Sequence, residues 1–313
     1  MARLSIVIPT LGRSAALPEV LAALERQRVA PGTFEVRIVL DAHGAAAPVE
    51  ALAAAPREFP LHVQHAARPG ASAARNCGWR AAGAPLVLFI DDDIVAAPAL
   101  VAEHLAWHDR DREPEVGVLG LVAWSRRVAV TPFMRWLETG IQFDYGTITG
   151  VEVEWQRFYS CNVSVKRELL ERTGGFDEER FPYGYEDLEL ARRMAHEHGL
   201  RLLFNPAARA EHLKTETLEG WRRNLKRIAL AERRFTELYP DEPAYFHERF
   251  RTATQAPLTR GRWARLAGVV GPDVPWLGRR VWRSYDLLCT QRLAPQFLAE
   301  WDAAATATEA RPA

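Results

Sequence analysis

Three consecutive carboxylates, Asp91, Asp92 and Asp93, directly follow the apolar residues 86–90. A short apolar run that ends at charge is typical of a buried strand whose next residues lie at the carboxyl edge of a sheet. Adjacent carboxylates repel one another, and a divalent cation with a preference for oxygen ligands, Mg²⁺ or Mn²⁺, would relieve that repulsion. The triplet therefore indicates a metal site. An acidic turn that caps the next helix is the alternative, because Asp also favours turns and helix starts.

Polar residues follow two other predicted strands. The strand predicted at 4–9 is followed by Thr10 and Arg13, which offer a hydroxyl group and a cation, and the strand predicted at 35–40 is followed by Asp41. The Asp41 carboxylate is suited to accept a hydrogen bond from a base or a ribose, although an isolated Asp here is also a common turn former. Because open α/β sheets bind ligands at the carboxyl ends of their strands, these groups are expected around one ligand.

Arg75 and Asn76 lie in a predicted helix that begins among small residues at 70–74. A helix N-terminus with an arginine nearby suits a phosphate group. A Gly/Ala-rich helix that packs closely on a sheet explains the same residues about as well.

Two further sites carry groups that can hold a proton or a metal. Glu186 and Asp187 begin a predicted amphipathic helix, where acids are also stabilised by the helix dipole alone. His212 follows the last predicted strand, and a lone histidine in such a place is more often packed or on the surface than functional.

The elements that must position these residues alternate along the first hundred residues. Strands are predicted at 4–9, 35–40, 61–64 and 86–91, with helices at 15–27, 46–55 and 71–82 between them. This alternation predicts an α/β fold with a parallel sheet and right-handed crossovers. Further along, helices are predicted at 98–108, 184–197, 217–239 and 276–301, and strands at 116–123, 158–165 and 201–204. The Ala/Thr-rich residues 302–313 are expected to be disordered.

The bulk composition excludes some classes of function. The 313 residues carry 40 Lys and Arg against 40 Asp and Glu, which argues against a nucleic-acid binder because such proteins need a basic surplus. The three cysteines, Cys77, Cys161 and Cys289, are far apart and form no zinc or disulfide pattern, which fits a reducing, cytoplasmic location. No segment approaches the roughly 20 apolar residues of a membrane span.

The order of these motifs resembles the inverting GT-A-fold glycosyltransferases of family 2. The resemblance covers about residues 4–215 and rests on the segments 5–10, 70–78, 89–93, 173–178 and 184–190, followed by His212. It implies a Rossmann-like GT-A fold with a mostly parallel sheet flanked by helices. Residues 1–105 would form the nucleotide-sugar-binding half, 106–215 the acceptor-binding half and 216–301 a C-terminal helical region.

The resemblance also assigns roles to individual residues. Asp93 would coordinate the cation that bridges the donor diphosphate, Asp91 would contact the ribose or the metal shell, and His212 would complete that shell and favour Mn²⁺. Asp187 would be the catalytic base, and Glu186 would bind the acceptor or orient the site. The remaining residues would bind the donor nucleotide, and they are Pro9, Thr10, Arg13, Asp41, Arg75, Asn76 and Asp92.

The expected activity is therefore a metal-dependent, inverting transfer from a nucleotide-sugar, with UDP or dTDP favoured. The acceptor would be a hydroxyl group of a saccharide, a lipid-linked saccharide or a secondary metabolite. Two alternatives stay open: a catalytically silent sugar-nucleotide-binding or scaffold protein, and a phosphotransferase that uses the two acids Asp91 and Asp93.

Aromatic and basic residues outside these motifs have two interpretations each. The aromatic residues among 124–157 predict either an acceptor wall or lid, or the core of a small subdomain. Arginines interleaved with tryptophans after residue 217 suit a peripheral contact with a membrane surface at its inner face, whereas a solvated helix face is the commoner explanation.

Overall fold

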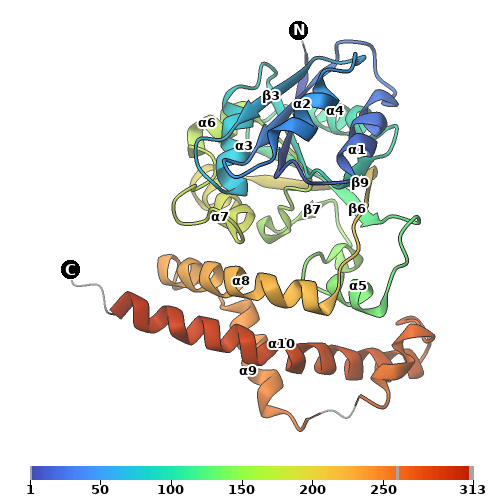
Figure 1. The fold of residues 1–313 in the computed structure, drawn as a ribbon, viewed down its shortest axis with the longest axis vertical. Helices are drawn as coiled ribbons and strands as arrows, with labels where there is room; N and C mark the ends of the chain where they lie inside the picture. The colour runs from blue at the N-terminus through green and yellow to red at the C-terminus, as the bar shows by residue number, and fades with distance from the viewer. Residues whose placement is uncertain (1, 259–260, 310–313) are drawn as a thin grey trace. The chain divides into compact units, whose positions relative to one another are not determined.

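The computed structural model describes residues 2–258 and 261–309. Within them the chain divides into two compact units. The first unit contains the residues up to Val128 together with residues 143–214, and the second contains residues 129–142 together with the chain from Thr215 onward (Figure 1).

A mixed sheet forms the centre of the first unit. In the described residues its strands follow the order β3 (Leu61–His65), β2 (Phe34–Leu40), β1 (Leu4–Thr10), β4 (Leu86–Ile90), β8 (Asn162–Lys166), β6 (Val116–Trp124), β9 (Arg201–His212) and β5 (Ile94–Ala96), and β7 (Glu152–Val153) pairs with β9. The strands β1–β4, β6 and β9 run in one direction, and β5, β7 and β8 run against them. The expected, mostly parallel α/β sheet is thereby confirmed.

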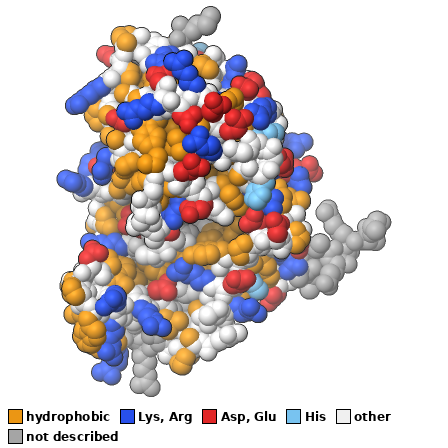
Figure 2. Space-filling view, turned by 180° about the vertical axis from the view of Figure 1, so that it is seen from behind, with side chains coloured by type: hydrophobic (Ala, Val, Ile, Leu, Met, Phe, Trp, Pro, Cys, Tyr) orange, Lys and Arg blue, Asp and Glu red, His pale blue; other side chains and the backbone are white. Residues whose placement is uncertain are grey.

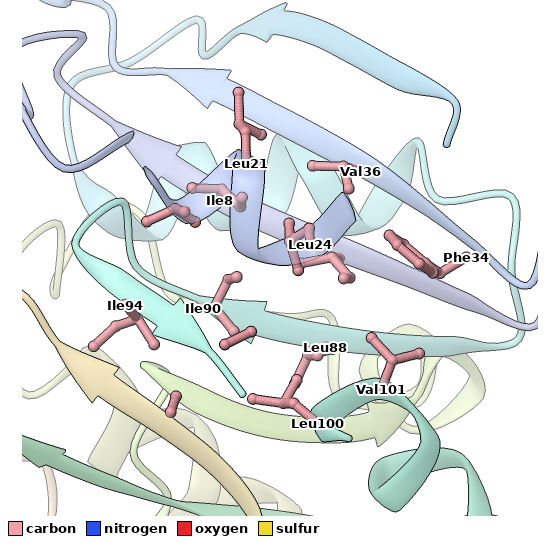
Figure 3. Packing of buried hydrophobic residues seen from close by; sticks show 14 of the residues in the cluster. Ile8, Leu21, Leu24, Phe34, Val36, Leu88, Ile90, Ile94, Leu100 and Val101 are labelled. Atoms are coloured by element: carbon pink, nitrogen blue, oxygen red, sulfur yellow. The ribbon is translucent and has the colours of Figure 1, made fainter. Parts of the chain in front are cut away.

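Helices cover both faces of this sheet. Side chains from α1 (Leu17–Glu25), α2 (Ala46–Ala53) and α4 (Leu100–Arg110) share one apolar cluster with the strands, and those from α3 (Ala71–Arg80), α6 (Arg167–Thr173) and α7 (Glu186–His198) share another. Figure 3 shows Ile8, Leu24 and Leu88 pointing into the first cluster. Because successive side chains of a strand point to opposite faces, strands buried on both faces are apolar almost throughout.

The second unit is helical. It consists of α5 (Pro132–Leu137), α8 (Leu218–Leu238), α9 (Tyr245–Gln255), the short 3-10 helix η3 (Ala264–Gly268) and α10 (Leu277–Glu309). The rings of Phe250 and Phe297 are fully buried between α9 and α10, with centroids 4.7 Å apart. No helix in the described part of the chain combines the length and the apolar character that crossing a bilayer requires.

Three expectations need correction. Residues 129–142, expected in the acceptor-binding half, belong to the helical unit, because α5 buries its apolar side chains there. The tail expected to be disordered from residue 302 continues helix α10 to Glu309, since a run such as Ala303 and Ala304 has high helix propensity; residues 310–313 lie outside the described residues. The strand expected at 201–204 extends to His212 as β9.

Candidate active site

The three carboxylates lie in the tight connection between β4 and β5, at the carboxyl end of the parallel strands. Burial, reinforced by Asp93 and Asp91 and opposed by the Thr10 hydroxyl, raises the pKa of Asp92 to about 6. Burial likewise raises the pKa of Asp91, where Arg75 opposes it and Asp93 and Asp187 add to it. Several carboxylates thus share one partly buried edge, and the mutual repulsion expected of the triplet is present.

Strand pairing brings His212 to this edge. Ile94 of β5 lies opposite His212 of β9, so the residue before β5, Asp93, meets the imidazole: His212 Nε2 is 3.2 Å from Asp93 Oδ2. Although burial acts to raise it, the hydrogen bond and charge of His212 hold the pKa of Asp93 below its ordinary value. The ring of Trp124 stacks on His212 at 5.0 Å and 11°, which fixes the plane of the imidazole.

The Asp93 and His212 side chains fit a divalent cation. Two ligand atoms that bind one ion at right angles, with bonds of about 2.1 Å, are about 3 Å apart. This separation is close to the 3.2 Å between His212 Nε2 and Asp93 Oδ2. A carboxylate with an imidazole suits Mn²⁺ and is compatible with Mg²⁺. Among the described residues no group of three or more His, Cys, Asp or Glu side chains could hold a metal. The predicted third ligand, Asp91, instead pairs with Arg75.

Arg75 joins the acids of β4 to those of α7. Its Nη2 donates to Asp91 Oδ1 at 2.9 Å, its Nη1 donates to Glu186 Oε1 at 3.0 Å, and Nη1 is also 3.9 Å from Asp187 Oδ1. The guanidinium is buried and its carbon lies 5.7 Å from the centre of the Phe176 ring. Arg75 therefore offsets the charge of acids on two elements.

Glu186 and Asp187 form the first turn of α7. Burial and the adjacent Asp187 raise the pKa of Glu186 to about 7, against the effect of Arg75. Asp187 Oδ2 accepts hydrogen bonds from the backbone N–H of Ser160 at 3.0 Å and from its hydroxyl at 2.9 Å. The other oxygen, Oδ1, has no hydrogen-bond partner among the residues that the structure describes. Asp187 is thus held by hydrogen bonds through one oxygen, while the second is buried and lies 3.9 Å from Arg75 Nη1.

The backbone just before these acids adopts an uncommon conformation. Tyr185 has φ of 61°, a left-handed conformation that is rare for a residue with a side chain and that concentrates at functional sites. Tyr185 directly precedes the first turn of α7, in which Glu186 and Asp187 lie.

Asp41 braces the β2 end of the site. Its carboxylate accepts hydrogen bonds from the N–H of His43 at 2.8 Å, the N–H of Gly70 at 2.6 Å and the Tyr183 hydroxyl at 2.6 Å. Burial acts to raise the pKa of Asp41, and these three bonds outweigh it and lower the pKa. At Gly70, with φ of 131°, a Cβ would lie 2.8 Å from the backbone oxygen of Pro182, so only glycine permits this close approach of α3 and the loop before α7.

The other predicted donor contacts differ in position. Thr10, at the end of β1, donates from its hydroxyl to Asp92 Oδ2 at 2.5 Å, and Pro9 lies beside it in the strand. Arg13 is exposed on the loop that follows. Thr10 thereby contacts the acids at the sheet edge, and the donor-binding role of this loop stays a prediction.

Asn76 is placed differently from its prediction. Its amide nitrogen donates to the Phe176 carbonyl at 2.8 Å and to Glu178 Oε1 at 2.7 Å, and its oxygen accepts from Trp79 Nε1 at 2.7 Å and from the Phe176 N–H at 2.9 Å. An amide makes at most four such bonds. Asn76 is therefore fully occupied in holding the loop 174–178, and it has no atom left for a donor contact.

Sequence reasoning missed three residues of this site: Ser160, Tyr183 and Trp124. Each acts through a predicted residue, since Ser160 holds Asp187, Tyr183 holds Asp41 and Trp124 stacks on His212. The only signal for Ser160 was its place in the predicted strand 158–165. The aromatic residues of 124–157 divide accordingly: Trp124 belongs to the site, whereas Trp136 is buried in the helical unit.

Comparison with family models identifies two matches along the chain. Residues 5–158 match the model for glycosyl transferase family 2. Residues 147–216 match the model described as the N-terminal domain of galactosyltransferase. Together the two ranges include every candidate site residue described above.

Curated relatives are distant and longer. A validoxylamine A glucosyltransferase from Streptomyces hygroscopicus subsp. limoneus is 30% identical over 231 residues, which is 63% of this chain and 48% of the relative. A protein of the same name from subsp. jinggangensis is also 30% identical, over 63% of this chain and 52% of the relative. The chain thus spans about half the length of the curated relatives it matches.

Solved structures share the fold. The TarS 1–349 structure from S. aureus in complex with UDP aligns with a TM-score of 0.53 at 15% identity, over 98% of this chain and 91% of that one. The mannosyltransferase PcManGT from Pyrobaculum calidifontis, in complex with GDP-Man and Mn²⁺, aligns with a TM-score of 0.53 at 20% identity, over 99% of this chain and 76% of that one.

Proposed function

Because the chain belongs to glycosyltransferase family 2, we propose that it transfers a sugar from a nucleotide-sugar to a hydroxyl group of an acceptor, with inversion at the anomeric carbon. The observation that carries this proposal is the pair of contacts made by Arg75. Its guanidinium bonds to Asp91 on the predicted donor side and to Glu186 on the predicted acceptor side. One buried residue thereby holds the two halves of a transferase site together.

Asp187 is the proposed general base. The two Ser160 bonds to Oδ2 fix the carboxylate, and Oδ1 accepts the proton of the acceptor hydroxyl as its oxygen attacks the anomeric carbon from the face opposite the leaving diphosphate. A base positioned in this way contributes on the order of 10² to 10⁴ in rate. Single in-line displacement gives inversion, and no covalent intermediate is needed.

Asp93 and His212 are the proposed metal-binding residues. A cation held by them would offset the charge that develops on the departing diphosphate. Two protein ligands suffice, since Mg²⁺ and related ions in nucleotide sites commonly take the remaining ligands from substrate phosphates and water. Asp91 keeps its bond to Arg75 and contacts the donor ribose, and Thr10 and Asp92 line the nucleotide beside it.

The donor class is proposed as a UDP- or dTDP-hexose, and the acceptor as a hydroxyl group of a saccharide, a lipid-linked saccharide or a secondary metabolite. The similarity to proteins named validoxylamine A glucosyltransferase supports glucose as the sugar and a secondary metabolite as an acceptor. The free thiols of Cys77, Cys161 and Cys289 fit the reducing compartment that we propose.

A thermal-shift panel of UDP, dTDP, GDP and CMP, each with and without Mn²⁺, tests the donor side. A nucleotide at 100 times its dissociation constant stabilises the protein by about 2.7 kcal/mol, and we expect this effect for UDP or dTDP only with the metal. Release of the nucleotide from the matching donor, with inverted product, then tests transfer. Binding without turnover of any donor would favour the silent sugar-nucleotide-binding alternative, and hydrolysis of a phosphomonoester without a donor would favour the phosphotransferase.

A further inference from the structure

Exposed apolar side chains concentrate in one loop of the helical unit. Of the ten large hydrophobic residues that are exposed in the described part of the chain, six lie between residues 258 and 276. We call them the tryptophan patch, and they are Leu258, Trp263, Leu266, Val269, Val274 and Trp276. Val269 is 83% exposed and Trp276 is 62% exposed. Clusters of this kind mark interaction surfaces rather than ordinary solvent-facing loops.

The charge around the tryptophan patch is strongly one-sided. Residues 258–285 contain six arginines and a single acid, Asp273, in a chain whose formal net charge is zero. Five of these arginines are described, and all five are exposed: Arg262, Arg265, Arg279, Arg280 and Arg283. Figure 2 shows hydrophobic and basic side chains gathered together at the lower left, around the start of α10.

Contacts within the loop hold the tryptophan patch in a defined shape. The guanidinium of Arg280 lies 4.6 Å from the ring centre of Trp263 and 5.7 Å from that of Trp276. Trp282 Nε1 donates to the carbonyl of Val270 at 2.9 Å, which ties the loop to the first turns of α10. The apolar tips are therefore presented by a folded loop.

We propose that the tryptophan patch docks the protein on an anionic lipid bilayer. Tryptophan prefers the membrane interface, where its apolar ring and polar N–H are both accommodated, and arginine binds anionic head groups while its stem packs on apolar surface. Leucine and valine tips between the arginines enter the acyl boundary. Because a lipid surface is fluid, it can accommodate apolar and arginine side chains that alternate at irregular spacing. The surplus of arginine favours negatively charged lipid. The docking does not depend on the proposed transfer reaction.

Vesicle co-sedimentation of the full chain tests the proposal. We expect binding to vesicles of phosphatidylcholine mixed with phosphatidylglycerol, a weaker response to phosphatidylcholine alone, and loss of binding as salt is raised. Each arginine near an anionic surface contributes about fivefold to partitioning, so Arg262→Gln with Arg265→Gln should weaken binding about thirtyfold. The matched control is Arg222→Gln with Arg223→Gln, two exposed arginines of α8, which should bind like the unaltered chain.

A second pair of variants tests the apolar part. Val269→Ser with Trp276→Ser should reduce vesicle binding, whereas Val151→Ser with Leu238→Ser, which alters exposed residues elsewhere, should not. Equal binding of patch and control variants, or no binding of the full chain to anionic vesicles, overturns the proposal. So does a lipid-free dimer that Val269→Ser with Trp276→Ser converts to a monomer, because the patch would then be an interface between two copies.

Discussion

At the scale of single residues, Asp187 and Glu186 are adjacent acids in different surroundings. Asp187 has one oxygen fixed by Ser160, and its other oxygen has no hydrogen-bond partner in the described residues and lies 3.9 Å from Arg75 Nη1. Glu186 is hydrogen-bonded to Arg75, and burial is the main cause that raises its pKa to about 7. Geometry therefore favours Asp187 as the base, although the pKa of Glu186 is raised to about 7.

Asp187→Asn keeps the size of the side chain and removes the proton acceptor. We expect donor binding to survive and kcat to fall by on the order of 10² to 10⁴, because the base acts on the acceptor in the transition state. Glu186→Gln should cost less. Single-turnover transfer and nucleotide affinity, measured for both variants, separate the two roles. If Glu186→Gln abolishes transfer while Asp187→Asn retains it, Glu186 is the base; if both are active, these acids only stabilise the start of α7.

The pair Asp93 and His212 gives a second residue-scale prediction. Asp93→Ala should abolish Mn²⁺-dependent nucleotide binding, since it removes the only carboxylate bonded to His212 in the described residues. His212→Ala should weaken that binding and shift preference from Mn²⁺ towards Mg²⁺, because imidazole favours the softer ion. Titration calorimetry of UDP with each metal measures both effects. Full transfer activity in EDTA would contradict this assignment.

At the scale of elements, the sequence predicts a strand correctly where a short apolar run is buried in the sheet. The apolar runs before Thr10, Asp41 and Asp91 predict β1, β2 and β4, and with them the edge at which these residues meet. Their contacts with residues far along the chain were beyond reach, because the bond of Arg75 to Glu186 joins positions 111 residues apart. Only the family resemblance relates the segments that contain Arg75 and Glu186. It does not show that all hydrogen-bonding positions of the Asn76 amide are occupied by contacts that hold the loop 174–178.

Two misread elements have identifiable causes. The sequence predicts a strand that ends at Phe204, and the Asn205–Pro206 pair that follows is typical of a turn. The strand in fact continues to His212, and the register with β6 shifts between Gly120 and Leu121 to accommodate the irregularity. That continuation is what carries His212 to Asp93. Strand β5 has three residues, which is too short for a periodic pattern to reveal.

A buried network of hydrogen bonds links the histidines of helix α4 to strand β8, and no sequence pattern predicts it. His104 Nε2 is 3.0 Å from Asn162 Oδ1, and the amide nitrogen of Asn162 donates to the Ala208 carbonyl. Asn162 Oδ1 is therefore the acceptor, and His104 Nε2 is the donor. Its Nδ1 then accepts from the Ser164 hydroxyl at 2.8 Å, and that hydroxyl accepts from His108 Nε2 at 2.9 Å. A proton on His104 Nδ1 would break the bond that Ser164 donates, and a proton on His108 Nδ1 would meet no hydrogen-bond partner in the described residues.

This network predicts acid sensitivity. Burial lowers the pKa of His104 to about 4 and that of His108 to about 3, whereas an unfolded histidine titrates near about 6.5. The unfolded state therefore binds more protons below that pH, and the free energy of unfolding should fall as pH drops from about 6.5 to about 3. His108→Phe, which retains the Ser164 to His104 bond, should flatten this slope in urea unfolding. An unchanged slope, or an equal change in His62→Phe at an exposed histidine, would contradict the explanation.

At the scale of the whole molecule, the two compact units are interleaved in sequence. The segment 129–142 leaves the sheet unit and returns to it, and it brings α5 to the helical unit, where Trp136 is buried and its Nε1 donates to Asp286 Oδ1 of α10 at 2.8 Å. The family resemblance implies that this segment lies with its sequence neighbours in the acceptor-binding half. Nothing local in the sequence shows that Trp136 bonds to a residue 150 positions away.

Trp136→Ala tests this interleaving. Truncating a buried tryptophan costs about 3 to 5 kcal/mol, and the cost should fall on the unit in which the ring is packed. Hydrogen exchange should therefore accelerate in α8 and α10, more than seventy residues downstream, while β1 and β4 keep their protection. Trp136→Phe retains most of the volume and loses only the bond to Asp286, so its effect should be smaller and in the same helices. Faster exchange confined to β6 and β8, the strands that flank the segment in sequence, would show instead that Trp136 stabilises the sheet unit.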